Sequence, residues 1–432
     1  PANGSPGTSA SPETARSPGQ PATRNRGWTV ALAGLGVNLA LGILYSWGVF
    51  SAALRDAGWT ATESQLPYMV ACLVFALLMV PGGRLQDRVG PKLALLLASI
   101  LTGAGFVLSG VFLTVGGLSL FFGVVFGTAM GFGYAATTPA AIKWFGPHRR
   151  GLISGVVVSG FGLAGIYLAP LTTFLIHRFN LRLAFVALGL GFSILILVFR
   201  HFVRNPPADH VPPAAPVTAV ARRRTAVARR DFQWKDMIRT PQFAALWLMF
   251  FFGTFAGLMI IGKLASIGKE QVGVTPGEAA VFVMLYAIFN WLGRIVFGLV
   301  SDRLGRKGTL IAIFVIQTAC YALFGLLTTP LLLALGTAMV AFCFGGMLSV
   351  FPAATADSFG VRNLGVNYGL VFTAWGFGGV LGPLLGGLVR DWTGSFNISY
   401  LVAAGLCLAG TILSFLEKPP AEPETGIPEV RD

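Results

Sequence analysis

The chain has 432 residues, of which 54% are hydrophobic and only 11% are charged, and its mean hydropathy is +0.73. This composition is typical of an integral membrane protein and excludes a secreted enzyme, a cytosolic dehydrogenase and a nucleic-acid-binding domain. The net charge of +14 therefore needs an explanation at a membrane surface.

Apolar stretches long enough to cross a bilayer recur along the chain, and all but one of them, 279–301, contain no charged residue. A helix needs roughly 20 apolar residues to span about 30 Å of hydrocarbon. Two stretches, 93–142 and 308–356, are of double length and bend at Gly116-Gly117 and Thr329-Pro330, so each supplies two helices. The other eight are 28–54, 64–83, 151–176, 183–199, 243–262, 279–301, 363–389 and 393–416. The sequence therefore predicts an all-α membrane protein with twelve transmembrane helices.

The basic residues predict the orientation of these helices. With both termini in the cytoplasm, 24 of the 31 Lys and Arg residues lie in cytoplasmic segments, 5 lie outside and 2 lie inside spans. Cytoplasmic loops carry an excess of Lys and Arg, so this arrangement is favoured, and the positive charge lies at the anionic leaflet. We expect a multi-pass protein of the cell (inner) membrane that binds no nucleic acid.

One sequence motif occurs twice, half a chain apart. The pattern Gly-x-x-x-Asp-Arg-x-Gly spans 83–90 and recurs at 298–305, an offset of 215 residues. The matching segments 139–141 and 352–354 keep nearly the same offset, which indicates a duplicated six-helix unit.

The motif is the signature of the major facilitator superfamily, which the chain resembles in helix number, motif position and repeat. The resemblance implies two pseudo-symmetric six-helix bundles, 28–203 and 242–416, around a site that opens alternately to each side. A cytoplasmic linker, 204–241, would join them, with a disordered N-terminal tail (1–27) and a cytoplasmic C-terminal tail (417–432). We expect the motif residues to act in conformational change: Gly83, Asp87, Arg88, Gly298, Asp302 and Arg303.

An arginine without an acidic partner lies inside the predicted helix 279–301. Burying the Arg294 guanidinium costs at least ~2.5–3.5 kcal/mol on insertion scales, so something must compensate it. Asn290, four residues earlier on the same helical face, can orient an anion beside the guanidinium fork, which binds both oxygens of a carboxylate. The alternative is that Arg294 braces backbone carbonyls near the inner gate. The repeat places Met79 where Arg294 would lie in the first half, so the binding charge is asymmetric.

The other cation counted inside the spans is Lys263, which directly follows the predicted apolar stretch 243–262 at its outer end. Two roles remain open for it. Its ammonium could reach the membrane interface, or it could line the pathway and there attract anions or carry a proton.

Several stretches resemble the oxalate/formate antiporter family, bacterial relatives of the monocarboxylate transporters. They are Leu44-Tyr45-Ser46-Trp47, Lys143-Trp144-Phe145, Arg239-Thr240-Pro241-Gln242-Phe243, Phe289-Asn290-x-x-x-Arg294 and Asn367-Tyr368-Gly369. The resemblance implies that Arg294 binds the substrate carboxylate. It also implies that Tyr45, Gln65, Tyr134, Phe161 and Phe344 close around the substrate.

The chain departs from the oxalate transporter pattern at Trp375, where that pattern has a lysine. One arginine suits one carboxylate, so we expect a monocarboxylate such as lactate, pyruvate or formate, with an apolar tail facing Trp375 and Phe344. The chain also lacks the lysine and the acidic partner of the arginine found in animal monocarboxylate transporters, so their proton mechanism does not carry over.

The sequence thus predicts a monomeric carrier that moves a small carboxylate with a proton by alternating access. One alternative is an oxalate/formate-type anion exchanger, and another is a carboxylate sensor that does not transport. We expect no enzyme activity, cofactor or metal, because neither loop nor tail offers a nucleophile with a base or a cofactor motif.

Overall fold

The computed structural model describes residues 22–212 and 231–416, and the secondary-structure elements of these residues are helices. Twelve helical segments are long and apolar enough to cross a membrane, which confirms the predicted number. The predicted tail residues 1–21 and 417–432, and residues 213–230 of the predicted linker, lie outside the described residues.

The first half consists of six spanning segments, of which the first and fourth are irregular. The first is α1 (Ala22–Leu41), the 3-10 turn η1 (Gly42–Ser46) and α2 (Trp47–Asp56). The fourth is α5 (Val115–Leu118), the π-helical stretch η2 (Ser119–Phe126) and α6 (Gly127–Ile142). The others are α3 (Ala61–Val89), α4 (Pro91–Val111), α7 (Arg150–Arg178), which follows the 3-10 turn η3 (Pro147–Arg149), and α8 (Leu181–Phe199). Because α1 begins at Ala22, residues 22–27 of the predicted tail are helical.

The second half consists of six continuous helices. They are α11 (Pro241–Val272), α12 (Pro276–Leu304), α13 (Arg306–Phe324), α14 (Pro330–Phe359), α15 (Leu364–Thr393) and α16 (Asn397–Leu416). The short helix α10 (Trp234–Met237) lies within the segment predicted as linker.

Equivalent helices of the two halves begin and end alike. α3 and α12 each start with a capping box, in which Thr60 or Thr275 accepts from the backbone of Glu63 or Glu278 and the glutamate accepts in return. Both helices end at a glycine of positive φ, 96° at Gly90 and 87° at Gly305, which a residue with a side chain rarely adopts. The motif therefore lies in the last turns of these helices rather than in a loop after them, so the expected ends at 83 and 301 were too early.

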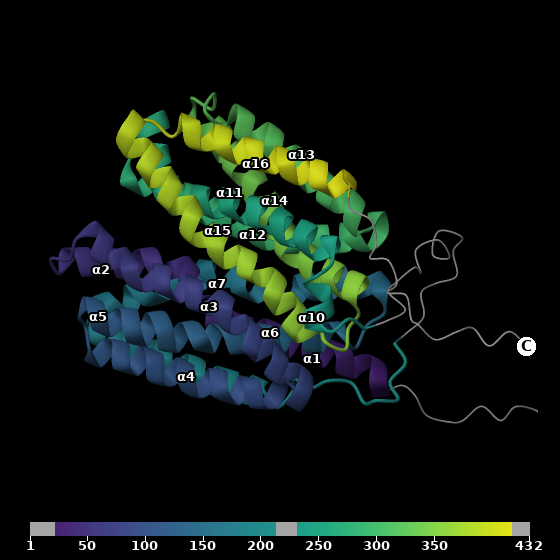
Figure 1. Cartoon of the computed structure of the whole chain (residues 1–432). Helices are drawn as coiled ribbons and strands as arrows, with labels where there is room; N and C mark the ends of the chain where they lie inside the picture. The colour runs from purple at the N-terminus through teal and green to yellow at the C-terminus, as the bar shows by residue number, and fades with distance from the viewer. Residues whose placement is uncertain (1–21, 213–230, 417–432) are drawn as a thin grey trace, which may run out of the picture.

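The halves pack along two pairs of helices, α3 against α15 and α7 against α12. Figure 1 shows the first half, purple to blue, below the second, green to yellow. They lie close together on the right, near α10, and diverge toward the left, where α2 and α5 lie. We call the end that carries Gly90 and Gly305 the motif end.

Candidate functional site

At the motif end, each motif aspartate caps a helix of the opposite half. The carboxylate of Asp87 accepts from the backbone N–H of Val366 in the first turn of α15 (2.9 Å). The carboxylate of Asp302 accepts from Gly151 (2.9 Å) and Leu152 (2.8 Å) in the first turn of α7. A negative charge is favourable there because the first N–H groups of a helix are unpaired and its dipole is positive.

The first glycine of each motif lets two backbones touch. A Cβ on Gly83 would lie 2.1 Å from the carbonyl oxygen of Gly365, and one on Gly298 would lie 2.5 Å from that of Gly151. No side chain fits at these distances, so the helix crossings seen here require glycine at both positions.

Ion pairs tie the same end together. Asp357 of α14 pairs with Arg150 of the other half and with Arg306, both at 2.8 Å. Arg306 also pairs with Asp302 (2.7 Å), and Lys143 pairs with Asp87 (3.0 Å).

The two motif arginines lie differently from the two aspartates. Arg88 and Arg303 are exposed, and neither takes part in an ion pair with a described residue. Within the motif, the aspartates and glycines therefore make the contacts between halves.

Arg294 lies farther along the same interface, in the middle of α12. Its side chain is 1% exposed. The guanidinium donates to the first half twice, from Nη1 to the carbonyl of Val158 on α7 and from Nη2 to the hydroxyl of Tyr45 (3.0 Å). Gly162, one turn beyond Val158, makes room for it, since a Cβ there would lie 3.1 Å from Nε.

Asn290 takes the other side of the guanidinium. Its Oδ1 accepts from Nε (3.1 Å) and from Nη2 (2.9 Å) of Arg294, so one amide oxygen occupies the side-on face. The end-on face, formed by Nη1 and Nη2, is held by Val158 and Tyr45. These acceptors are neutral, and the guanidinium forms no ion pair with a carboxylate in the described ranges. The hydrogen bonds are largely satisfied, but the charge is not neutralised.

Predicted site residues of both halves form an aromatic cluster beside Arg294. The ring of Phe161 makes edge contacts with Tyr45 (centroids 5.8 Å apart) and Tyr134 (5.7 Å). The Trp375 ring stacks on Phe372 (5.2 Å), and Phe372 packs on Tyr134 (5.3 Å).

Sequence reasoning missed Phe75 and Phe372, which link the two parts of this cluster. The ring of Phe75 lies 5.8 Å from that of Phe161, 5.1 Å from that of Phe372 and 5.3 Å from that of Trp375. The repeat offset of 215 residues relates Phe75 to Asn290, so the signal that located Met79 could also have found it.

Three predicted residues lie outside this cluster. Gln65 is exposed and donates to Ser51 (3.0 Å), so the structure does not bring it to Arg294. Phe344 is buried in the second half, with its ring 6.4 Å from that of Tyr286. Lys263 is half-buried in the part of α11 away from the motif end, and a Cβ on Gly387 would lie 3.1 Å from its Nζ.

The family model described as Major Facilitator Superfamily matches residues 28–273 and 259–431, which together cover most of the chain. The chain belongs to this superfamily. It is a transporter and a multi-pass membrane protein, not an enzyme.

Three curated relatives match over most of their length. The oxalate:formate antiporter of Oxalobacter formigenes is 29% identical over 91% of both chains. An uncharacterised transporter of the superfamily from Escherichia coli (strain K12) is 31% identical over 82% of this chain and 86% of its own. Monocarboxylate transporter 13 of Bos taurus is 25% identical over 89% of this chain and 88% of its own.

Solved structures share the fold. The human organic anion transporter MFSD10 superposes with a TM-score of 0.71 at 17% identity and covers 91% of this chain and 100% of its own. The transporter FucP in the outward conformation gives a TM-score of 0.66 at 14% identity and covers 89% of this chain and 98% of its own.

Proposed function

We propose that the protein transports a small monocarboxylate, such as lactate, pyruvate or formate, by alternating access and binds its carboxylate at Arg294. The observation that carries the proposal is a guanidinium, 1% exposed, whose acceptors are neutral oxygens. A buried cation without a counter-charge is costly, and an anionic substrate would supply the charge.

The geometry supports a specific mode of binding. The end-on face of the guanidinium meets only groups of the first half, the carbonyl of Val158 and the hydroxyl of Tyr45. A carboxylate that takes this face replaces two neutral acceptors with a charged, bidentate one, which is the stronger arrangement. Asn290 keeps the side-on face and holds the guanidinium in place. Substrate binding would thus be coupled to breaking a contact between the halves.

The surroundings of Arg294 favour one carboxylate over two. Trp375 and Phe372 form an apolar wall of the aromatic cluster, and Lys263 lies beside Gly387, outside that cluster. A second carboxylate would find no cation there, whereas a methyl or other short apolar tail would lie against the aromatic rings.

The basic residues support an orientation with the motif end in the cytoplasm and both termini on that side, in a cell membrane. The hydrogen bonds between the halves described above extend from the motif end to Arg294 and Tyr45. The arrangement then corresponds to a state closed to the cytoplasm. We propose that the working unit is a monomer.

Proton symport would make the transfer electroneutral, and uptake into proteoliposomes tests it. Radiolabelled lactate, pyruvate and formate are offered with and without an inward proton gradient, and Arg294→Lys serves as the inactive control. We expect uptake that the gradient accelerates. An uptake rate that is the same with and without the gradient would reject symport. Absence of uptake of all three acids would reject the substrate class.

A second candidate, oxalate/formate-type exchange, is favoured by the 29% identity to the oxalate:formate antiporter. Exchange requires substrate inside the vesicle. Uptake of labelled formate that occurs only when the vesicles are preloaded with oxalate or formate would establish exchange. Equal uptake into empty vesicles would exclude it.

A further inference from the structure

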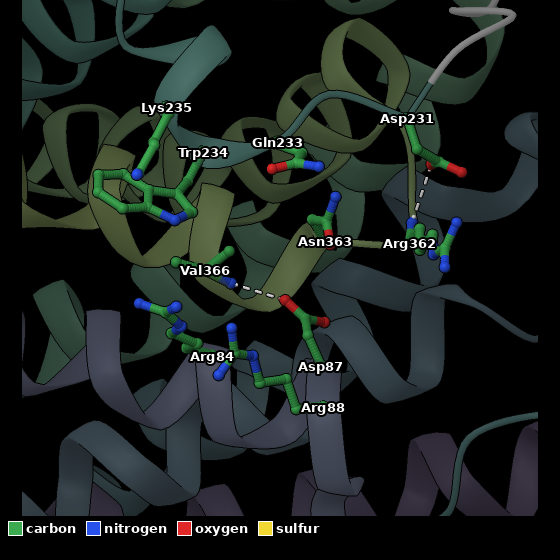
Figure 2. A pocket seen from close by; sticks show the side chains of 10 residues that line it. All are labelled: Arg84, Asp87, Arg88, Asp231, Gln233, Trp234, Lys235, Arg362, Asn363 and Val366. Atoms are coloured by element: carbon green, nitrogen blue, oxygen red, sulfur yellow. Dashed lines mark hydrogen bonds between the residues drawn. The ribbon is translucent and has the colours of Figure 1, made fainter.

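A pocket at the motif end, separate from Arg294, has no role in the transport proposal. Its volume is about 440 Å³. The end of α3, the segment around α10 and the start of α15 enclose it, as Figure 2 shows. It therefore lies where both halves meet the chain that joins them.

Four cations line this pocket from three separate segments. Arg84 and Arg88 come from α3, Lys235 from α10 and Arg362 from the loop before α15. All four are exposed, and none of them pairs with a carboxylate of the described residues. Arg84 and Arg88 are four residues apart on one helical face, where like charges repel each other. Bringing Lys235 and Arg362 to the same space adds to this repulsion.

The two acidic residues of the pocket are already engaged. The carboxylate of Asp87 pairs with Lys143 and accepts from the backbone of Val366. Asp231 accepts from the backbone N–H of Arg362 (3.0 Å). The pocket therefore keeps an excess of positive charge that the protein does not compensate.

We propose that this pocket binds a phosphate group, either of a phospholipid headgroup or of a soluble phosphate. Phosphate carries its charge on several oxygens, which suits guanidinium groups that converge from different directions. Trp234, whose ring lies 5.7 Å from Nζ of Lys235, adds an aromatic side chain of the kind common at membrane interfaces.

Because the cationic side chains of the pocket come from both halves, the pocket should bind phosphate best when the motif end is closed. Arg84 and Arg88 move with the first half, and Arg362 moves with the second. Separation of α3 from α15 would move the cations apart, so bound phosphate and closure stabilise each other.

Amine labelling of the wild-type protein tests binding without any substitution. The modification rate of Lys235 is compared with that of exposed Lys269, in α11 toward the opposite end. The protein is kept in detergent micelles that contain no phosphate. One arm adds inorganic phosphate to these micelles, and the other adds phosphatidylglycerol. We expect labelling of Lys235 alone to slow, by about threefold at a phosphate concentration of twice the Kd.

Protection in the first arm identifies a soluble phosphate, protection in the second a lipid headgroup, and either supports the proposal. Absence of protection in both arms would overturn it. So would equal protection by chloride at the same ionic strength, because that effect is only screening.

Variants locate the site. Arg84→Gln with Lys235→Gln should abolish the rise in Tm that the effective anion produces. The matched control, Arg55→Gln with Arg178→Gln, removes two exposed arginines elsewhere in the chain and should keep that rise. Loss of the rise in both double variants would contradict a site in this pocket.

Asp87→Ala separates closure from simple electrostatics. Removing a negative charge from the pocket by itself would tighten phosphate binding. Removing the contact of Asp87 with Val366 loosens the crossing of α3 and α15, which would weaken binding. We expect weaker protection of Lys235, and stronger protection would refute the dependence on closure.

Discussion

Arg294 and Tyr45 join the two halves of the transporter near the middle of the interface. Nη2 of Arg294 donates to the Tyr45 hydroxyl over 3.0 Å, although the residues are 249 positions apart in the sequence. The ring of Tyr45 lies against that of Phe161, so the hydrogen bond connects the buried charge of the second half with the part of the aromatic cluster that the first half contributes. This relationship makes the site depend on how the halves are placed.

Arg294→Lys should abolish most transport and leave the protein folded. A lysine keeps the charge but loses the fork, so it cannot hold a carboxylate through two parallel hydrogen bonds. Loss of one charge-assisted hydrogen bond, about 1.5–3 kcal/mol, corresponds to roughly a 10- to 140-fold fall in substrate affinity. Uptake and thermal unfolding measure the two effects, with exposed Arg55→Lys as the control. Normal uptake by the Arg294→Lys variant would show that Arg294 only braces backbone carbonyls and does not bind substrate.

Tyr45→Phe should lower the stability of the substrate-free protein by about 1 kcal/mol. The change deletes the hydroxyl that accepts from Arg294 and keeps the ring that packs on Phe161. Thermal unfolding without substrate measures the loss. Tyr167→Phe, which removes a hydroxyl bonded to Leu39 within the first half, is the comparison. If added substrate raises the unfolding temperature of both variants by the same amount, the hydrogen bond between Arg294 and Tyr45 is not coupled to substrate binding.

Trp375→Lys should shift the substrate preference from monocarboxylates toward dicarboxylates. Trp375 is 4% exposed and packs on Phe75 and Phe372, so a lysine there places a second cation in the aromatic cluster. A buried cation needs a counter-charge, which the second carboxylate of oxalate would supply. Competition of unlabelled oxalate and lactate against labelled formate measures the shift. Trp375→Met controls for loss of the ring, and an unchanged preference in the lysine variant would contradict the one-cation explanation.

Gly83→Ala should impair closure of the motif end and slow transport at least tenfold. The added Cβ would lie 2.1 Å from the carbonyl oxygen of Gly365, so α3 and α15 could not approach as they do here. Gly308→Ala is the matched control, because nothing lies within 4 Å of a Cβ at that glycine. Turnover is measured in proteoliposomes alongside Tm. A similar turnover in both variants would show that the crossing need not be this close.

The sequence by itself determined the number and approximate limits of the spanning helices. Hydrocarbon accepts only segments that satisfy their own backbone hydrogen bonds, so length and hydropathy suffice to find them. The repeat relates the two motifs, and the cost of burying a charge singles out Arg294 from the sequence alone. Local sequence also determines helix starts, since Thr60 and Thr275 form the same capping box at the start of α3 and α12.

Only the tertiary structure decided which groups meet across the halves. The partners of Asp87 and Arg294, the N–H of Val366 and the carbonyl of Val158, are backbone groups that any residue could supply. Phe75 lies in the aromatic cluster, whereas Gln65 does not. Hydropathy does not predict this difference, because lipid and protein interior are equally apolar and the pattern does not reveal which face of a spanning helix points inward. The placement of the two halves sets these contacts, and under the proposed alternating access that placement changes during transport.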